Sequence, residues 1–236
     1  MRLKPSATAQ LGAIAVFVKT PECSPVKTRL AREVGLAAAM QVYSLSCAAV
    51  ASVLMQAQRQ LNVKIYWAVA EPEALSHSRW TQFEACAQGA GVLGERMQRV
   101  FDALLKTHRY ALLLGADAPQ ITLDDLRQAD VILRSDSPQH LLAPASDGGF
   151  WCVGGNLAIP SQVWRETIYS SPNTLHDFEA LLSLHPFPKA AKLRRLTDID
   201  TLADWQRARL ELQLLQDPTL AQSALIELEL IRHADS

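Results

Sequence analysis

The sequence has little of what marks zinc-binding, secreted, membrane or nucleic-acid-binding proteins. Its four cysteines are far apart and form no Cys-x-x-Cys pair, which argues against a zinc site and against a secreted disulfide scaffold. No run approaches the roughly 20 apolar residues that cross a membrane. The formal net charge is −1 and neither half is strongly basic. We therefore expect a cytoplasmic protein with no membrane span and no nucleic-acid partner.

Several nucleotide-binding and hydrolytic motifs are also missing. There is no Gly-x-x-x-x-Gly-Lys-Ser/Thr phosphate loop, and no Gly-x-Gly-x-x-Gly follows the first apolar run. The six histidines are scattered without metal-ligand spacing, and no Gly-x-Ser-x-Gly nucleophile elbow occurs. These absences disfavour a P-loop NTPase, a dinucleotide-binding enzyme and a Ser-His-Asp hydrolase.

The bulk composition is that of a globular enzyme. The chain has 236 residues, of which 49% are apolar and 20% are charged. This length suits one α/β domain. The N-terminus carries positive residues, but its apolar stretch is too short for a signal peptide. We expect a flexible tail over residues 1–11 and a single domain over residues 12–236.

Apolar runs alternate with helical patterns along the chain. Strands are predicted at residues 12–18, 63–69, 110–114, 140–144, 150–153 and 191–196. Helices are predicted at residues 36–61, 96–106, 173–184, 201–215 and 219–231, and in a segment that Thr122 caps. Such alternation is typical of an α/β fold with a mostly parallel central sheet and helices on both faces.

Ligands of such sheets bind beyond the carboxyl ends of the strands. The segment that follows the first strand, residues 19–30, contains Lys19, Lys27 and Arg29 among two prolines. Ammonium and guanidinium groups in a turn-rich loop can pair with the oxygens of a diphosphate. A solvated basic loop explains this segment equally well at this stage.

Acidic residues follow later strands. Asp117 comes after the third strand, where its carboxylate could hold Mg²⁺ or Mn²⁺, or could make an Asx-turn before Pro119. Asp198 and Asp200 are two residues apart, so in an extended segment they project to the same side. Their spacing suits a divalent cation, although Asp200 could instead cap the next helix.

A glycine pair follows the fourth strand. Asp147 precedes Gly148 and Gly149, which permit positive φ angles or close approach of a ligand to the backbone. Asp-Gly is also a strong hairpin signal, and the two interpretations are compatible.

Taken in order, these segments resemble a known family. They are similar to bacterial glycosyltransferase-A-like proteins, formerly of unknown function, whose relatives are linked to arsenosugar biosynthesis. The matching segments span nearly the whole chain: Phe17-Val-Lys19, Val26-Lys-Thr-Arg-Leu30, Leu93-Gly-Glu-Arg-Met97, Gly115-Ala-Asp-Ala-Pro119, Pro144-Ala-Ser-Asp-Gly-Gly-Phe150 and Asp198-Ile-Asp-Thr201.

The resemblance implies a fold of the nucleotide-diphospho-sugar transferase type and a set of site residues. The chain departs from the family where Ser24 replaces a frequent glycine, where Tyr169-Ser-Ser171 replaces Trp-Ser-Thr, and where Asp-x-Asp is reduced to Asp117. The implied roles are phosphate binding for Lys19, Lys27, Arg29 and Arg96, metal binding for Asp117 with Asp200, and sugar or acceptor contact for Asp147, Gly148 and Gly149.

Three functional hypotheses follow. The leading one is metal-dependent glycosyl transfer from a nucleotide-diphospho-sugar to a small acceptor, with Asp147 as general base. The alternative is nucleotidyl transfer from a nucleoside triphosphate to a phosphorylated small molecule. The third is a non-catalytic nucleotide-sensing or partner-binding protein that has only the fold. Each agrees with a nucleotide ligand and with a monomer or homodimer.

Overall fold

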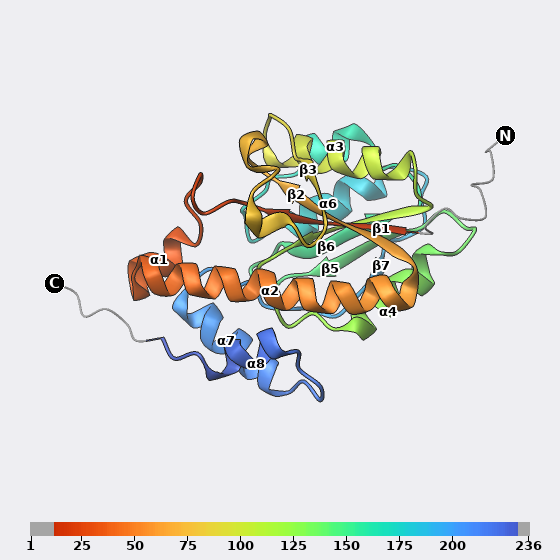
Figure 1. Cartoon of the computed structure of the whole chain (residues 1–236). Coiled ribbons are helices and arrows are strands. Elements are labelled where there is room, and N and C mark those ends of the chain that lie inside the picture. The colour runs from red at the N-terminus through yellow and green to blue at the C-terminus, as the bar shows by residue number, and fades with distance from the viewer. Residues whose placement is uncertain (1–11, 231–236) are drawn as a thin grey trace.

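A seven-stranded sheet forms the centre of the molecule, in the order β3-β2-β1-β4-β6-β5-β7 (Figure 1). The computed structural model describes residues 12–230. The strands are β1 (Gly12–Val18), β2 (Val63–Val69), β3 (Glu84–Ala87), β4 (Tyr110–Gly115), β5 (His140–Pro144), β6 (Phe150–Gly155) and β7 (Ala191–Lys192). Only β6 runs antiparallel to its neighbours, β4 and β5. The predicted mostly parallel sheet is therefore confirmed.

Helices cover both faces of this sheet, as predicted. They are α1 (Thr28–Val34), α2 (Leu36–Leu61), α3 (Leu93–Leu105), α4 (Leu123–Leu133), α5 (Ser161–Glu166), α6 (Thr174–Ser183), α7 (Leu202–Gln213) and α8 (Leu220–Glu227), with short 3-10 turns η1 (Pro72–Ala74) and η2 (Ser78–Trp80). Helices α2 and α4 pack on one face, and α3, α5 and α6 pack on the other. Figure 1 shows these two layers on opposite sides of the strands.

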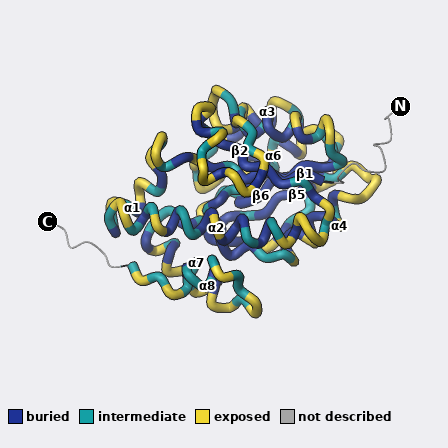
Figure 2. The backbone as a smooth tube through the Cα atoms, in the orientation of Figure 1, coloured by how far each residue is buried: buried dark blue, intermediate teal, exposed yellow. Residues whose placement is uncertain are grey.

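Strand β1 illustrates why the apolar runs form the sheet. Ile14 and Val16 point into the core under α2 and α4, whereas Ala13 and Ala15 point into the core under α3. Successive side chains of a strand face opposite sides, so a strand covered on both faces needs an unbroken apolar run. Figure 2 shows the central strands among the most buried parts of the chain.

Helix α2 is the longest element, and it packs against the sheet on one side and against other helices on another. Val50 and Leu54 contact the sheet, whereas Ala39, Val42 and Ala49 belong to a further core formed with α1, α7 and α8. By length and composition alone α2 could cross a membrane, a test that core helices of soluble proteins also pass. Here 56% of its most apolar 18-residue stretch is buried. The absence of a membrane span stays a prediction.

The last two helices form a third layer. Trp205 of α7 and Leu225 of α8 are buried against α1 and α2. Both helices begin with a capping box, in which Thr201 pairs with Asp204 and Thr219 pairs with Gln222. This layer holds the chain that precedes α7 against the carboxyl ends of the strands, where the candidate site lies.

Some elements differ from the sequence-based expectation. Strand β3 and helices α1 and α5 are short and were not predicted, because none is long enough to show a clear period. The strand predicted at residues 191–196 is observed only over Ala191–Lys192, and Arg194 beyond it pairs with Asp125. The predicted tail, residues 1–11, and the end of the last predicted helix, residue 231, lie outside the described residues.

His140 at the start of β5 gives a pH-dependence that can be measured. Its ring is 1% exposed and packs edge-on against Phe187, and burial lowers the pKa of this imidazole below its ordinary value. The unfolded chain therefore takes up a proton first as the pH falls, so the folded state loses stability below an ordinary histidine pKa of about 6.5. Replacing His140 with Leu should reduce the loss of unfolding free energy between about pH 7.5 and about pH 5, measured by urea denaturation.

The exposed His176 provides the control for this measurement. His176→Leu removes an imidazole at the surface, so at about pH 7.5 its free energy of unfolding should stay close to that of the unmodified protein. Equal pH-dependence in the unmodified protein and in His140→Leu would show that His140 is not held neutral by burial.

Candidate functional site

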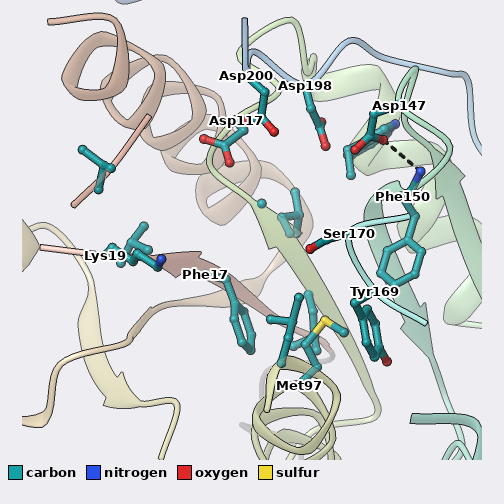
Figure 3. Close-up of a pocket in the computed structure, with 18 of the residues that line it drawn as sticks. Phe17, Lys19, Met97, Asp117, Asp147, Phe150, Tyr169, Ser170, Asp198 and Asp200 are labelled. Carbon is teal, nitrogen blue, oxygen red and sulfur yellow. Dashed lines mark hydrogen bonds between the residues drawn. The ribbon is translucent and has the colours of Figure 1, made fainter. Parts of the chain in front are cut away.

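A cavity of about 570 Å³ opens beside the carboxyl ends of β1 and β4. Strands β2 and β3, which follow β1 in the chain, lie on one side of β1, and the next strand, β4, lies on its other side. The direction in which strands are added to the sheet therefore reverses between β1 and β4. Open α/β sheets bind ligands at such points, because the loops leaving the two strands diverge there. Figure 3 shows aspartates grouped along one side of the opening and apolar side chains along the other.

The loop after β1 is held in place from behind. The Thr20 N–H donates to a carboxylate oxygen of the buried Glu71 at 2.8 Å, and the Trp80 ring N–H donates to the Thr20 hydroxyl at 3.0 Å. Glu22 accepts from the guanidinium of Arg79, with the shortest contact at 2.8 Å. The segment between β2 and β3 therefore fixes the loop that carries the predicted phosphate-binding residues.

Lys27 is the most constrained residue of that loop. It precedes α1 in a left-handed conformation, with φ 48° and ψ 38°, which a side chain other than glycine adopts at a cost of about 1–2 kcal/mol. Its side chain is 3% exposed, and its Nζ lies 2.5 Å from Asp117 and 3.5 Å from Asp200. Ser24, which replaces a frequent family glycine, does not have a positive φ. The unusual backbone of the loop is thus at Lys27.

Two backbone links place the acidic residues together. The N–H of Ile199 donates to the carbonyl of Asp117 at 3.1 Å, and the N–H of Ser146 donates to the carbonyl of Leu196 at 2.9 Å. Ile199 is fully buried, and the residues on either side of it, Asp198 and Asp200, line the cavity, as their two-residue spacing predicts. The segment before α7 therefore runs past the carboxyl ends of the strands, from the end of β5 to the end of β4.

The turn after β5 presents a further carboxylate. Asp147 is exposed, and its Oδ1 accepts from the N–H of Gly149 at 2.8 Å, which orients the side chain (Figure 3). Gly148 has φ 91°, and its carbonyl accepts from the N–H of Leu175 at 2.9 Å. A Cβ on Gly148 would lie 1.9 Å from the carbonyl oxygen of Pro172. Gly148 thus packs the turn against the chain before α6 and does not line the cavity.

The other residues predicted from the sequence lie around the same cavity. Lys19 is exposed at the end of β1, and its N–H and carbonyl both hydrogen-bond the hydroxyl of Tyr43. Arg29 is 66% exposed, with its Nη1 3.6 Å from Asp200. The Nε of Arg96, in the first turn of α3, donates to the carbonyl of Gly91 at 2.7 Å. All three line the cavity, as do Asp117, Asp147, Gly149 and Asp200.

The opposite side of the cavity is apolar and was not predicted. Phe17, Met97, Phe150 and Tyr169 line it, and Figure 3 shows Phe17, Met97 and Tyr169 side by side. The hydroxyl of Tyr169 donates to the carbonyl of Trp164 at 3.0 Å, so its ring rather than its hydroxyl is available to a ligand. Met97 appears in the sequence only as an apolar position with helical spacing, which does not distinguish a core residue from a cavity wall.

Three further cavity residues were not among the site residues predicted from the sequence. Tyr43 interrupts an Ala-, Leu- and Gln-rich helix, which was the only signal for it. Ser170 has φ 57°, a conformation that sequence does not reveal for a residue other than glycine or asparagine. Asp198 was paired with Asp200 by its spacing but was not chosen as a ligand. Among the described residues, three residues other than glycine have a positive φ. Two of these three, Lys27 and Ser170, line the cavity.

Carboxylates outnumber nearby cations at the polar end. Burial raises the pKa of Asp198 well above its ordinary value, and the neighbouring charges of Asp117 and Asp147 raise it further, against the effect of Lys27. Oxygen ligands and surplus negative charge fit Mg²⁺ or Mn²⁺ in chemical type. Within residues 12–230, however, no three His, Cys, Asp or Glu side chains form a group that could hold a metal ion. The point between Asp117 and Asp200 is taken by the ammonium of Lys27.

Comparisons with solved structures agree with this fold. A provisionally named nucleotide-diphospho-sugar transferase from Desulfovibrio desulfuricans G20 superposes with a TM-score of 0.78 at 22% identity, over 91% of this chain and 93% of the other. A 4-diphosphocytidyl-2C-methyl-D-erythritol synthase from Anaerococcus prevotii DSM 20548 superposes with a TM-score of 0.51 at 11% identity, over 88% of this chain and 99% of the other. At these identities the likeness establishes the fold, which is of the nucleotide-diphospho-sugar transferase type.

The sequence comparisons identify the family. No curated protein matches the sequence of this chain. The family described as "Uncharacterized protein conserved in bacteria (DUF2064)" matches residues 51–171, which is more than half of the chain. This agrees with the resemblance that the ordered motifs suggest. The chain therefore belongs to the bacterial protein family DUF2064.

Proposed function

We propose that this protein transfers a glycosyl group from a nucleotide-diphospho-sugar to a small acceptor. The observation that carries the proposal is the cavity at the strand-order reversal, where buried Lys27 meets carboxylates from the end of β4 and from the chain before α7. The fold supports it, since the Desulfovibrio desulfuricans protein that shares it bears a nucleotide-diphospho-sugar transferase name.

The cations around the cavity would bind the diphosphate of the donor. Lys19, Lys27, Arg29 and Arg96 all line this space, and ammonium and guanidinium groups form strong charge-assisted hydrogen bonds to phosphate oxygens. Lys27 and Arg29 sit nearest to the acidic end, so they would neutralise charge that builds on the leaving diphosphate. When bound, Mg²⁺ or Mn²⁺ would add to that neutralisation, held by Asp117 and Asp200.

Asp147 would act on the acceptor. Its carboxylate is exposed to the cavity and is oriented by the N–H of Gly149. In an inverting transfer, the acceptor hydroxyl oxygen bonds to the anomeric carbon as the bond from that carbon to the diphosphate oxygen breaks. Asp147 takes the hydroxyl proton, and the nucleoside diphosphate leaves with the bonding electron pair.

Nucleotidyl transfer is the second candidate. Asp-x-Asp, which typifies sugar transferases, is reduced to Asp117 because Gly115 stands at the other position. The fold is also shared with a diphosphocytidyl synthase. In that reaction the same cations would neutralise the pyrophosphate that leaves a nucleoside triphosphate.

A panel assay separates these reactions. Purified protein is incubated with UDP-, GDP-, CDP-, ADP- and dTDP-glucose, with and without Mn²⁺, and nucleoside diphosphate release is measured. We expect release from at least one donor, together with a thermal shift, because a ligand present at about 100 times its Kd adds about 2.7 kcal/mol of stability. Pyrophosphate release from nucleoside triphosphates with sugar 1-phosphates would favour the second candidate. Binding without turnover would favour a nucleotide sensor, and no binding at all would contradict all three.

A further inference from the structure

Lys27 occupies a place that is unusual for a phosphate-binding lysine. Its Nζ contacts two aspartates that lie more than 80 positions apart in the sequence, Asp117 and Asp200. Ile199 hydrogen-bonds the backbone of Asp117, so the two carboxylates are held in register by the fold rather than by Lys27. The ammonium therefore fills a gap between two fixed anions.

This ammonium is held close to both carboxylates. The Lys27 side chain is 3% exposed, and its Nζ lies 2.5 Å from Oδ1 of Asp117 and 3.5 Å from Oδ1 of Asp200. Arg29 is 66% exposed, and its Nη1 lies 3.6 Å from Oδ2 of Asp200, the oxygen that Lys27 does not contact. One ammonium on a buried side chain therefore serves both Asp117 and Asp200.

We propose that Lys27 is an internal counter-ion that competes with a divalent cation for Asp117 and Asp200. An ammonium 2.5 Å from a carboxylate oxygen stands where Mg²⁺ would need to approach that oxygen to about 2.0–2.1 Å. An ammonium and a divalent cation cannot both occupy the point between these two Oδ1 atoms, because they would overlap and repel each other at short range. A cation that binds between these oxygens must displace the ammonium.

The cavity offers space for the displaced ammonium. The lysine stem is flexible, so Nζ can swing into the cavity without a change at the backbone, which Val26 and Leu30 anchor in the core. If the proposed function holds, the freed ammonium would meet the diphosphate of the donor. Cation binding would then prepare the phosphate site, which links the two ligands through one side chain.

Manganese binding without any nucleotide tests the competition directly. The unbound Mn²⁺ signal is followed by electron paramagnetic resonance during titration of the unmodified protein, Lys27→Met and Arg29→Met. We expect Lys27→Met to bind Mn²⁺ at least about tenfold more tightly than the unmodified protein, because the competing charge is gone while both carboxylates remain. Arg29→Met should change the affinity less than about threefold, because its pair is exposed.

Two additions keep this test decisive. Lys27→Gln retains a polar side chain if Lys27→Met folds poorly, and thermal unfolding with and without Mn²⁺ should show a larger Mn²⁺-induced rise in Tm for either Lys27 variant than for the unmodified protein. Equal or weaker Mn²⁺ affinity in both variants would overturn the competition. Because no nucleotide is present, this outcome is independent of whether the protein turns over nucleotide-sugars, which the donor panel measures separately.

Discussion

Asp117→Asn is expected to lower kcat/KM for nucleotide-sugar turnover by about 100- to 1000-fold, the loss typical of removing one electrostatic group from an active site. Asp117 contacts the ammonium of Lys27 and is one of the two carboxylates that would hold a divalent cation. Asparagine keeps the shape of the side chain but removes its charge, so the position of Lys27 and the affinity for a cation should both suffer. Steady-state kinetics with the donor identified by the panel would measure the effect.

Asp124→Asn is the matched control for this substitution. Asp124 lies on α4, its side chain is 84% exposed, and its pair with Arg127 is a surface contact. Such pairs contribute little, so both turnover and Tm should stay near those of the unmodified protein. Turnover by Asp117→Asn within about threefold of the unmodified protein would remove Asp117 from the active site, since a participating charge contributes far more.

The elements that sequence predicted well are those whose burial leaves a pattern. Strands β1 and β2 match their predicted bounds because both faces of each strand are covered, which requires an unbroken apolar run. Strand β3 lies at the edge of the sheet, pairs only with β2 and is largely exposed, so it carries no such run. Helix α1 was hidden because it spans only seven residues and begins among the cationic residues of the loop.

The candidate site was partly predictable for a different reason. The carboxyl ends of neighbouring parallel strands lie side by side, so residues that directly follow β1 and β4 lie near each other whatever conformation their loops adopt. That rule brought Lys27 and Asp117 to one cavity. It did not reveal their ion pair, which depends on a left-handed backbone at Lys27 and on the hydrogen bond from Ile199 to Asp117. Both are consequences of tertiary packing.

The ion pair also changes how the predicted metal site is understood. From sequence, Asp117 and Asp200 were two carboxylates in need of a cation, and Lys27 was a separate phosphate ligand. In the structure one lysine joins both groups, so the cation site and the phosphate site are not independent. Substitutions on either side should therefore couple, as residues that share a partner generally do.

The backbone of the Asp147 turn is the other place where a single change should have a large effect. Gly148→Ala is expected to lower the free energy of unfolding by about 2–4 kcal/mol, from left-handed strain and from overpacking. The φ of 91° disfavours any side chain, and the new Cβ would lie 1.9 Å from the carbonyl oxygen of Pro172. For a chain of this length the loss corresponds to a fall in Tm of roughly 5–15 °C, measurable by calorimetry.

Gly115→Ala provides the comparison that isolates this effect. Gly115 ends β4 without a positive φ, and the nearest atom to an added Cβ is 3.9 Å away, so Tm should change little. Because the Gly148 carbonyl accepts from Leu175, a strained turn should also shift Asp147 and reduce acceptor-dependent turnover in the protein that remains folded. If Gly148→Ala is as stable as Gly115→Ala, the turn can move away from Pro172, and Asp147 is not rigidly positioned.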